Sequence, residues 1–117
     1  MGAEQLKVRT QAFGLEIIRL IQSLPSRGAE HIIGQQLLRS GMSVGANFRA
    51  ACRARSRMDF IAKLKIVEEE CDESAYWLEM LQQIGKGTHL TPTLLDEANQ
   101  LLSIIVASIK TARANAK

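Results

Sequence analysis

The sequence predicts an all-α protein, an antiparallel up-down-up-down four-helix bundle that forms one domain over residues 1–117. Apolar residues recur every three or four positions along four segments, which is the period of a helix face packed on a core. No segment shows the alternation of a strand, and only 2 Pro and 8 Gly interrupt the chain. With 46% hydrophobic but only 4% aromatic residues, we expect a single aliphatic core.

The first helix is predicted over residues 3–24, where Thr10 is the one polar exception in the apolar seam. That seam consists of Ala3, Leu6, Thr10, Phe13, Ile17, Leu20 and Leu24. Pro25 ends the segment, because it lacks an amide N–H and its ring clashes with the preceding turn. Val8 and Leu15 lie seven residues apart on the opposite side, so we expect an exposed apolar strip suited to self-association.

The second helix is predicted over residues 29–54. Its seam consists of Ile33, Leu37, Ser40 or Gly41, Val44, Phe48 and Ala51. Gly34, Gly41 and Gly45 lie inside this helix, and each costs about 1 kcal/mol relative to Ala. We explain that cost by the close approach of a neighbouring helix.

Ser43 and Asn47 stand one turn apart beside this seam. They form either a polar patch for a ligand or a hydrogen-bonded structural pair that sets helix register. We favour the structural pair, with Glu70 or Glu73 of the third helix as its partner.

The third helix is predicted to begin at Ser56, whose hydroxyl, with Asp59, resembles a capping box. Its seam consists of Phe60, Leu64, Val67, Cys71, Ser74, Leu78 and Leu81. A second stripe, Trp77, Met80 and Ile84, is expected to widen the buried face. Gly85 or Gly87 is a natural C-terminal stop.

The fourth helix is predicted to begin with Thr91 as its N-cap and Pro92 at the first helical position. Its seam consists of Leu94, Ala98, Leu101, Ile105, Ser108 or Ile109, and Ala112. Leu95, Leu102 and Val106 add a second apolar flank. The width of this apolar face again suits a partner surface.

The net charge of +3 is unevenly distributed along the chain. Residues 39–65 contain seven basic side chains and Asp59 as the only acid. The basic residues are Arg39, Arg49, Arg53, Arg55, Arg57, Lys63 and Lys65. Residues 66–80 contain six acids and no base. Either the basic segment meets phosphate or an acidic partner, or the two blocks complement each other across the fold.

The sharpest candidate site is a nucleic-acid-binding cluster. Its members are Arg49, Arg53, Arg55, Arg57 and Lys63. Since Arg49, Arg53 and Arg57 recur every four residues, one helix face could carry all three. Guanidinium groups suit phosphate oxygens, but no aromatic residue interleaves them. We therefore predict salt-sensitive contacts to the nucleic-acid backbone, without base stacking.

No catalytic, metal-binding or cofactor-binding residue is predicted. His31 and His89 lack the Glu three residues earlier that di-metal bundles use. Cys52 with His31 is the only nucleophile–base pair, and about 31 Å of helix separates them. We therefore expect a protein that is not an enzyme.

A cytoplasmic protein without membrane contact is expected. The longest apolar run, residues 104–107, is far too short to span a membrane. Charged residues such as Glu4 and Lys7 interrupt any signal-peptide segment. Cys52 and Cys71 fall on core stripes, so we expect two buried free thiols in a reducing compartment.

The run SVGANFRAACRARS at residues 43–56 resembles the signature of the four helix bundle protein family, encoded in intervening sequences of bacterial large-subunit ribosomal RNA genes. Residues 36–40 and 72–79 share the resemblance, which covers nearly the whole chain. It implies a bacterial, cytoplasmic homopentamer, related to the accessory variability protein of diversity-generating retroelements. That relative partners a reverse transcriptase and nucleic acid. Many members carry an acid where this chain has Ala50, so any role of that carboxylate is lost here.

The sequence thus predicts a non-enzymatic, homo-oligomeric helical module that binds RNA or DNA backbone through its arginine cluster. The alternative is a protein–protein interaction scaffold with no nucleic-acid role, based on the apolar breadth of the first and fourth helices. Expected partners are copies of the chain, RNA or DNA, and a reverse transcriptase or another protein.

Overall fold

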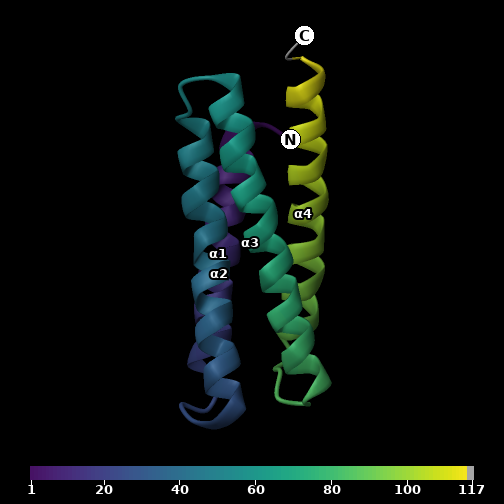
Figure 1. Ribbon diagram of the computed structural model, residues 1–117. Coiled ribbons are helices and arrows are strands. Elements are labelled where there is room, and N and C mark those ends of the chain that lie inside the picture. The colour runs from purple at the N-terminus through teal and green to yellow at the C-terminus, as the bar shows by residue number, and fades with distance from the viewer. Residues whose placement is uncertain (116–117) are drawn as a thin grey trace.

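Four antiparallel helices joined by short turns make up the computed structural model, which describes residues 1–115 (Figure 1). The helices are α1 (Ala3–Gln22), α2 (Gly28–Cys52), α3 (Arg57–Gln83) and α4 (Thr91–Ala114). The bundle measures 49 × 21 × 20 Å, and the described residues contain no strand. The predicted all-α up-down-up-down bundle is therefore confirmed. Residues 116–117, the last of the predicted domain, lie outside the described part.

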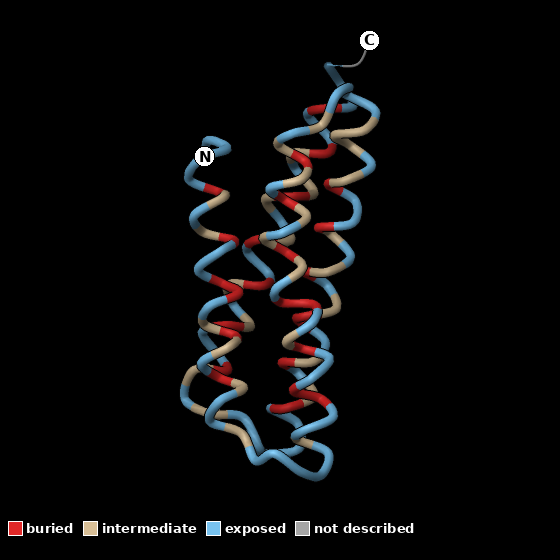
Figure 2. Tube along the Cα trace, turned by 90° about the vertical axis from the view of Figure 1, so that its left-hand side faces the viewer, coloured by how far each residue is buried: buried red, intermediate tan, exposed pale blue. Residues whose placement is uncertain are grey.

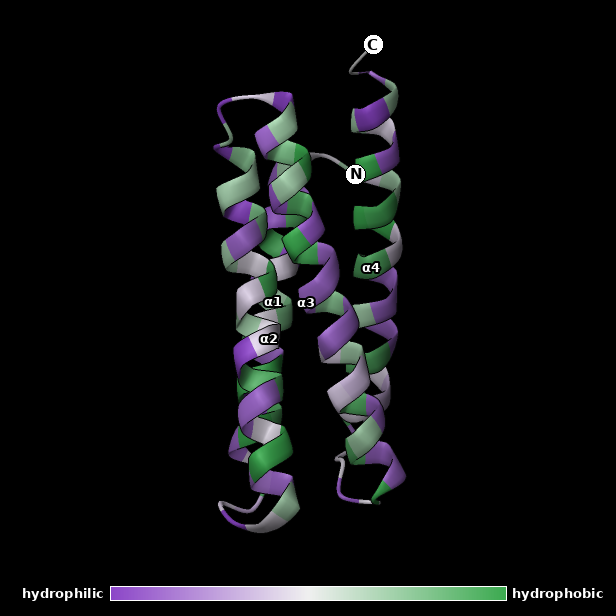
Figure 3. Cartoon of the chain, viewed as in Figure 1, coloured by the Kyte–Doolittle hydropathy of each residue, from purple (hydrophilic) through white to green (hydrophobic). Residues whose placement is uncertain are grey.

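The predicted seams face one another and form a single aliphatic core (Figure 2). Each helix contributes a fully buried leucine: Leu20, Leu37, Leu64 and Leu101. Burial of one such side chain contributes about 1.5–3 kcal/mol, so the core dominates the stability of the bundle. In Figure 3, hydrophobic and hydrophilic segments alternate along every helix, as one-sided burial requires.

Two predicted helix ends are confirmed. The amide of Asp59 donates to the Ser56 hydroxyl at 3.0 Å, which caps the start of α3. At the other end, Gly85 adopts φ +68°, and the Lys86 amide donates to the Leu81 carbonyl at 3.0 Å. This glycine-dependent turn ends α3 and sends the chain toward α4.

The predicted cap of α4 is wrong. Thr91 is the first residue of the helix and is buried, and its hydroxyl accepts from the Thr88 amide at 2.9 Å. Thr88 in turn accepts from the Leu90 amide at 3.1 Å. The threonines therefore order the turn before α4, and Pro92 moves one position further into its first turn. Ile84 is also mispredicted: it is 40% exposed, because α3 ends at the preceding residue.

The glycines of α2 lie where α1 comes closest. A Cβ added to Gly41 would lie 2.9 Å from Cγ1 of Ile17, and one added to Gly45 would lie 3.3 Å from the backbone of Thr10. The close approach that the sequence predicts is confirmed. It removes side-chain volume from the α1–α2 contact and lets the two backbones pack directly.

The contact between α1 and α4 is the smallest among neighbouring helices. One polar clamp joins them: Arg9 donates to both carboxylate oxygens of Glu97, at 2.7 Å each, and to Gln100 at 2.8 Å. This hydrogen bond to Glu97 raises the pKa of Arg9 further above its usual range. Toward the start of α1 the two helices leave room for a surface cleft.

Candidate nucleic-acid interface

The four predicted arginines surround the corner between α2 and α3. Arg49 lies in the last turn of α2, Arg53 follows its end, Arg55 lies in the turn and Arg57 begins α3. The prediction that Arg49, Arg53 and Arg57 share one helix face is wrong, because α2 ends at Cys52 and not at residue 54. All four side chains are exposed.

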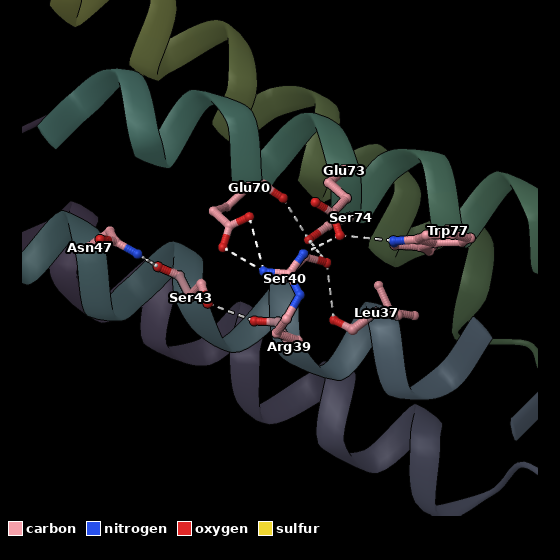
Figure 4. A network of polar contacts seen from close by, with 9 residues as sticks. All are labelled: Leu37, Arg39, Ser40, Ser43, Asn47, Glu70, Glu73, Ser74 and Trp77. Carbon is pink, nitrogen blue, oxygen red and sulfur yellow. Dashed lines mark hydrogen bonds and ion pairs between the residues drawn. The ribbon is translucent and has the colours of Figure 1, made fainter. Parts of the chain in front are cut away.

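None of these four arginines forms an ion pair within residues 1–115. Their expected acidic partners on α3 are instead occupied by Arg39, which pairs with Glu70 at 3.2 Å and with Glu73 (Figure 4). Hydrogen bonds from Trp77 and Arg39 lower the pKa of Glu73. Within residues 1–115, the basic and acidic blocks thus pair only through Arg39.

Lys63 is the weakest member of the predicted cluster. Its ammonium nitrogen lies 2.7 Å from the Asp59 carboxylate, one helical turn away. This contact lowers the pKa of Asp59, so the carboxylate stays ionised and offsets the Lys63 charge. The positive charge available to a polyanion therefore comes mainly from the arginines.

The fold adds basic residues that the sequence prediction did not include. Antiparallel packing places the last turns of α4, with Lys110 and Arg113, at the same end of the bundle as the α2–α3 turn (Figure 1). Apart from Arg27, every described cation without an ion pair belongs to this region. We call these residues the basic end: Arg49, Arg53, Arg55, Arg57, Lys65, Lys110 and Arg113.

Two surface clefts divide the arginines. The terminal cleft, of about 900 Å³, lies between the start of α1, the α2–α3 corner and the end of α4, and Arg57 lines it. The α1–α2 groove, of about 550 Å³, has Arg49 and Arg53 along it, together with the apolar side chains of Val8 and Leu15. Arg57 therefore faces a different surface from Arg49 and Arg53, and Arg55 lines neither cleft.

Comparison with known proteins assigns the chain to a family. A family model described as 23S rRNA-intervening sequence protein matches residues 4–107. The chain belongs to this family. A solved structure from Bacteroides thetaiotaomicron, described as a protein with unknown function from the S23 ribosomal protein family, is 33% identical and covers 94% of this chain and 99% of its own. Its TM-score of 0.86 indicates the same helical fold, and no curated protein matches the chain.

Ser43 and Asn47 hydrogen-bond within their own helix (Figure 4). Ser43 donates to the Arg39 carbonyl at 2.7 Å, and the Asn47 amide donates to the Ser43 carbonyl at 2.9 Å. The expected contact with Glu70 or Glu73 is not made within residues 1–115. The two side chains are satisfied by the backbone, which is a structural role.

The polar contact between α2 and α3 involves another pair, Ser40 and Ser74. Their hydroxyl oxygens are 2.9 Å apart, and both side chains are fully buried. Two serines at seam positions of facing helices were the signal for this contact. This hydrogen bond favours one relative position of α2 and α3 in an otherwise apolar interface.

The two thiols of this family member differ in burial. Cys71 is buried, and its pKa is raised to about 12 by burial and by the acids around it. Cys52 is only partly buried and lines the terminal cleft, and burial raises its pKa too. The expectation of two buried thiols is thus correct only for Cys71. Both thiols stay protonated near neutral pH, which disfavours a nucleophilic role.

Among residues 1–115, no three His, Cys, Asp or Glu side chains gather as metal ligands. No helix in that part of the chain is long and apolar enough to cross a membrane.

Proposed function

We propose that this protein is a non-enzymatic, oligomeric helical module that binds the sugar–phosphate backbone of RNA or DNA through its basic end. The observation that carries the proposal is the gathering of unpaired cations from α2, α3 and α4 at one end of the bundle. Exposed guanidinium groups bind phosphate oxygens and release condensed counterions, which favours association. Such binding is strong at low salt and reads little sequence.

The proposed assembly is a ring of five copies. Val8, Leu15 and Met42 along the α1–α2 groove are each about half exposed or more, beside the cation of Arg49. The outer face of α3 after Lys65 has the opposite charge, with exposed Tyr76 and the acids Glu69, Asp72 and Glu79. Since α1 and α3 do not touch, the α3 acids lie away from the α1 wall of the groove. Complementary surfaces so placed support head-to-tail association, and a ring would multiply weak nucleic-acid contacts.

The absence of catalysis and a cytoplasmic location are part of the proposal. His31 lies near the start of α2 and Cys52 at its end, too far apart within one subunit to act as base and nucleophile. Free Cys52 and Cys71 support a reducing compartment.

The proposal is tested by measuring the affinity for RNA across a series of salt concentrations. We expect the triple variant R53A/R55A/R57A to bind more weakly and to show a shallower dependence on salt. Each lost phosphate contact lowers the slope of log K against log salt by about 0.7–0.9.

A matched control removes three cations from the opposite end of the bundle, as R19A/R27A/K86A. This variant loses the same charge and should bind nearly as tightly as the unaltered protein. Equal losses in the two variants would show that net charge alone acts. Undetectable or salt-independent binding would contradict the proposal.

The alternative, a protein–protein scaffold, has one observation in its favour, the exposed Val8, Leu15 and Met42 along the α1–α2 groove. Apolar side chains gathered on one surface mark interaction sites. A single protein partner that stays bound after nuclease treatment, combined with no affinity for RNA, would favour the scaffold.

A further inference from the structure

The terminal cleft is open because small residues line it. Ala51, Ala54, Ala107 and Ala112 form much of its walls, and α1 contacts α4 only sparingly. Its volume of about 900 Å³ falls within the range of small-molecule sites. The cleft therefore has room for a planar ring and its substituents.

The chemistry of the cleft combines an aromatic surface with polar groups and a cation. Phe60, in the first turn of α3, and Ile104 of α4 supply apolar surface. Thr111 and Asn115 supply groups that donate or accept hydrogen bonds, and Arg57 lies on the same cleft. A nucleobase matches this lining, because its two faces are apolar and its edge carries hydrogen-bonding groups.

We infer that the terminal cleft holds an unpaired base of a single-stranded nucleic acid whose backbone lies along the basic end. The inference rests on the proposed function and narrows its ligand class to single strands. Charge complementarity favours this occupant, because Arg55 and Arg113 on neighbouring segments can follow the phosphates on either side. In a duplex the bases are stacked and paired, so none can enter the cleft without being flipped out.

Phe60 is the residue that makes base stacking possible, contrary to the expectation from the sequence. No aromatic residue interleaves the arginines, and sequence alone therefore argued against base stacking. In the fold, Phe60 is one turn from Arg57 and lines the same cleft. An aromatic surface beside the phosphate-binding cations is the arrangement that single-strand-binding proteins use.

The experiment compares a short single-stranded RNA with the duplex of the same sequence, at one salt concentration. We expect the unaltered protein to prefer the single strand. The substitution Phe60→Leu keeps an apolar side chain but removes the aromatic face, and should weaken single-strand binding about tenfold with duplex binding unchanged. The control Met58→Leu alters an exposed apolar side chain near Phe60 that does not line the cleft, and should change neither affinity.

A second variant, Ala107→Leu, narrows the cleft without altering Phe60 and should also weaken single-strand binding selectively. If circular dichroism shows that Phe60→Leu is poorly folded, Ala107→Leu tests by itself whether the cleft holds a base. Fluorescence of 2-aminopurine in the RNA should change when the base leaves its neighbours and enters the cleft of the unaltered protein, and should change less with Phe60→Leu.

Salt-sensitive binding with equal affinity for both RNAs, unchanged in both cleft variants, would overturn this inference and leave the proposed function intact. Undetectable binding of either RNA would overturn both. A change in oligomeric mass caused by Phe60→Leu, with unchanged RNA affinity, would assign the cleft to a subunit interface and also overturn the inference.

Discussion

At the scale of single residues, the α1–α2 contact shows that two glycines in helices can have opposite roles. Gly41 faces the buried Ile17, and an added Cβ would lie 2.9 Å from Cγ1 and 3.3 Å from Cβ of that side chain. Gly14 faces the backbone of α2 at 3.6 Å, an ordinary contact distance. Close packing therefore requires glycine at position 41 but not at position 14.

The substitution Gly41→Ala should lower the free energy of unfolding by about 1 kcal/mol. Overpacking against Ile17 costs about 1–3 kcal/mol, and the better helix propensity of Ala offsets part of it. Gly14→Ala should instead raise the stability, by up to about 1 kcal/mol. Urea unfolding measures both, and equal effects in the two variants would contradict the assigned role of Gly41.

At the scale of elements, polar contacts on two levels tie α2 to α3. The buried hydroxyls of Ser40 and Ser74 meet in the interface, and the more exposed Arg39 reaches Glu70 and Glu73 (Figure 4). Alternative registers of the two helices would separate these partners and lose the hydrogen bond between the two hydroxyls. These polar contacts therefore help to fix the register of α2 against α3, which apolar contacts alone specify less well.

The Glu73 contact predicts a pH-dependent contribution to stability. Hydrogen bonds from the Trp77 indole, at 3.1 Å, and from Arg39 lower the pKa of Glu73 in the folded chain. A carboxylate with a lowered pKa stabilises the fold above its unfolded pKa of about 4.3, and this contribution is lost as the pH falls through the folded value.

Glu73→Gln should therefore lower the free energy of unfolding at pH 7, by about 1 kcal/mol or less because the pair is partly exposed. The difference from the unaltered protein should shrink when the pH is lowered to about 3. Fluorescence of Trp77 during urea unfolding reports the change, with exposed Glu79→Gln as the control. A difference that is the same at both pH values would argue against an ionic contribution.

At the scale of the whole molecule, charge is separated between surfaces. Arg49 borders a groove with an apolar strip, and the outer face of α3 carries Glu69, Asp72 and Glu79 without a described ion pair. Separate surfaces of opposite charge can pair between copies and exclude pairing of like surfaces. Head-to-tail contacts of this kind form a closed ring when the rotation between copies permits it.

Light scattering should accordingly report a mass five times that of the 12.9 kDa chain. Leu15→Glu places an acid in the α1–α2 groove and should shift the protein toward smaller species. Ile32→Glu introduces the same charge at an exposed apolar position outside that groove and should leave the mass unchanged. A monomeric unaltered protein would contradict the proposed assembly.

Much of the fold follows from short stretches of sequence. The three-or-four spacing places Leu20, Leu37, Leu64 and Leu101 in the core, and Ser56 marks the start of α3. These features depend on neighbours within one or two helical turns, which any single segment contains. For the same reason the arginine cluster could be named as a candidate site, although its geometry could not.

The arrangement of the site was decided by tertiary structure. The end of α2 at Cys52 separates Arg57 from the face that carries Arg49, and antiparallel packing brings Arg113 to the same end. The cleft containing Phe60 exists because α1 and α4 leave space there. Local periodicity determines which face of each helix is buried, but only packing determines which helix ends meet. The core was therefore readable from the sequence, whereas the site required the fold.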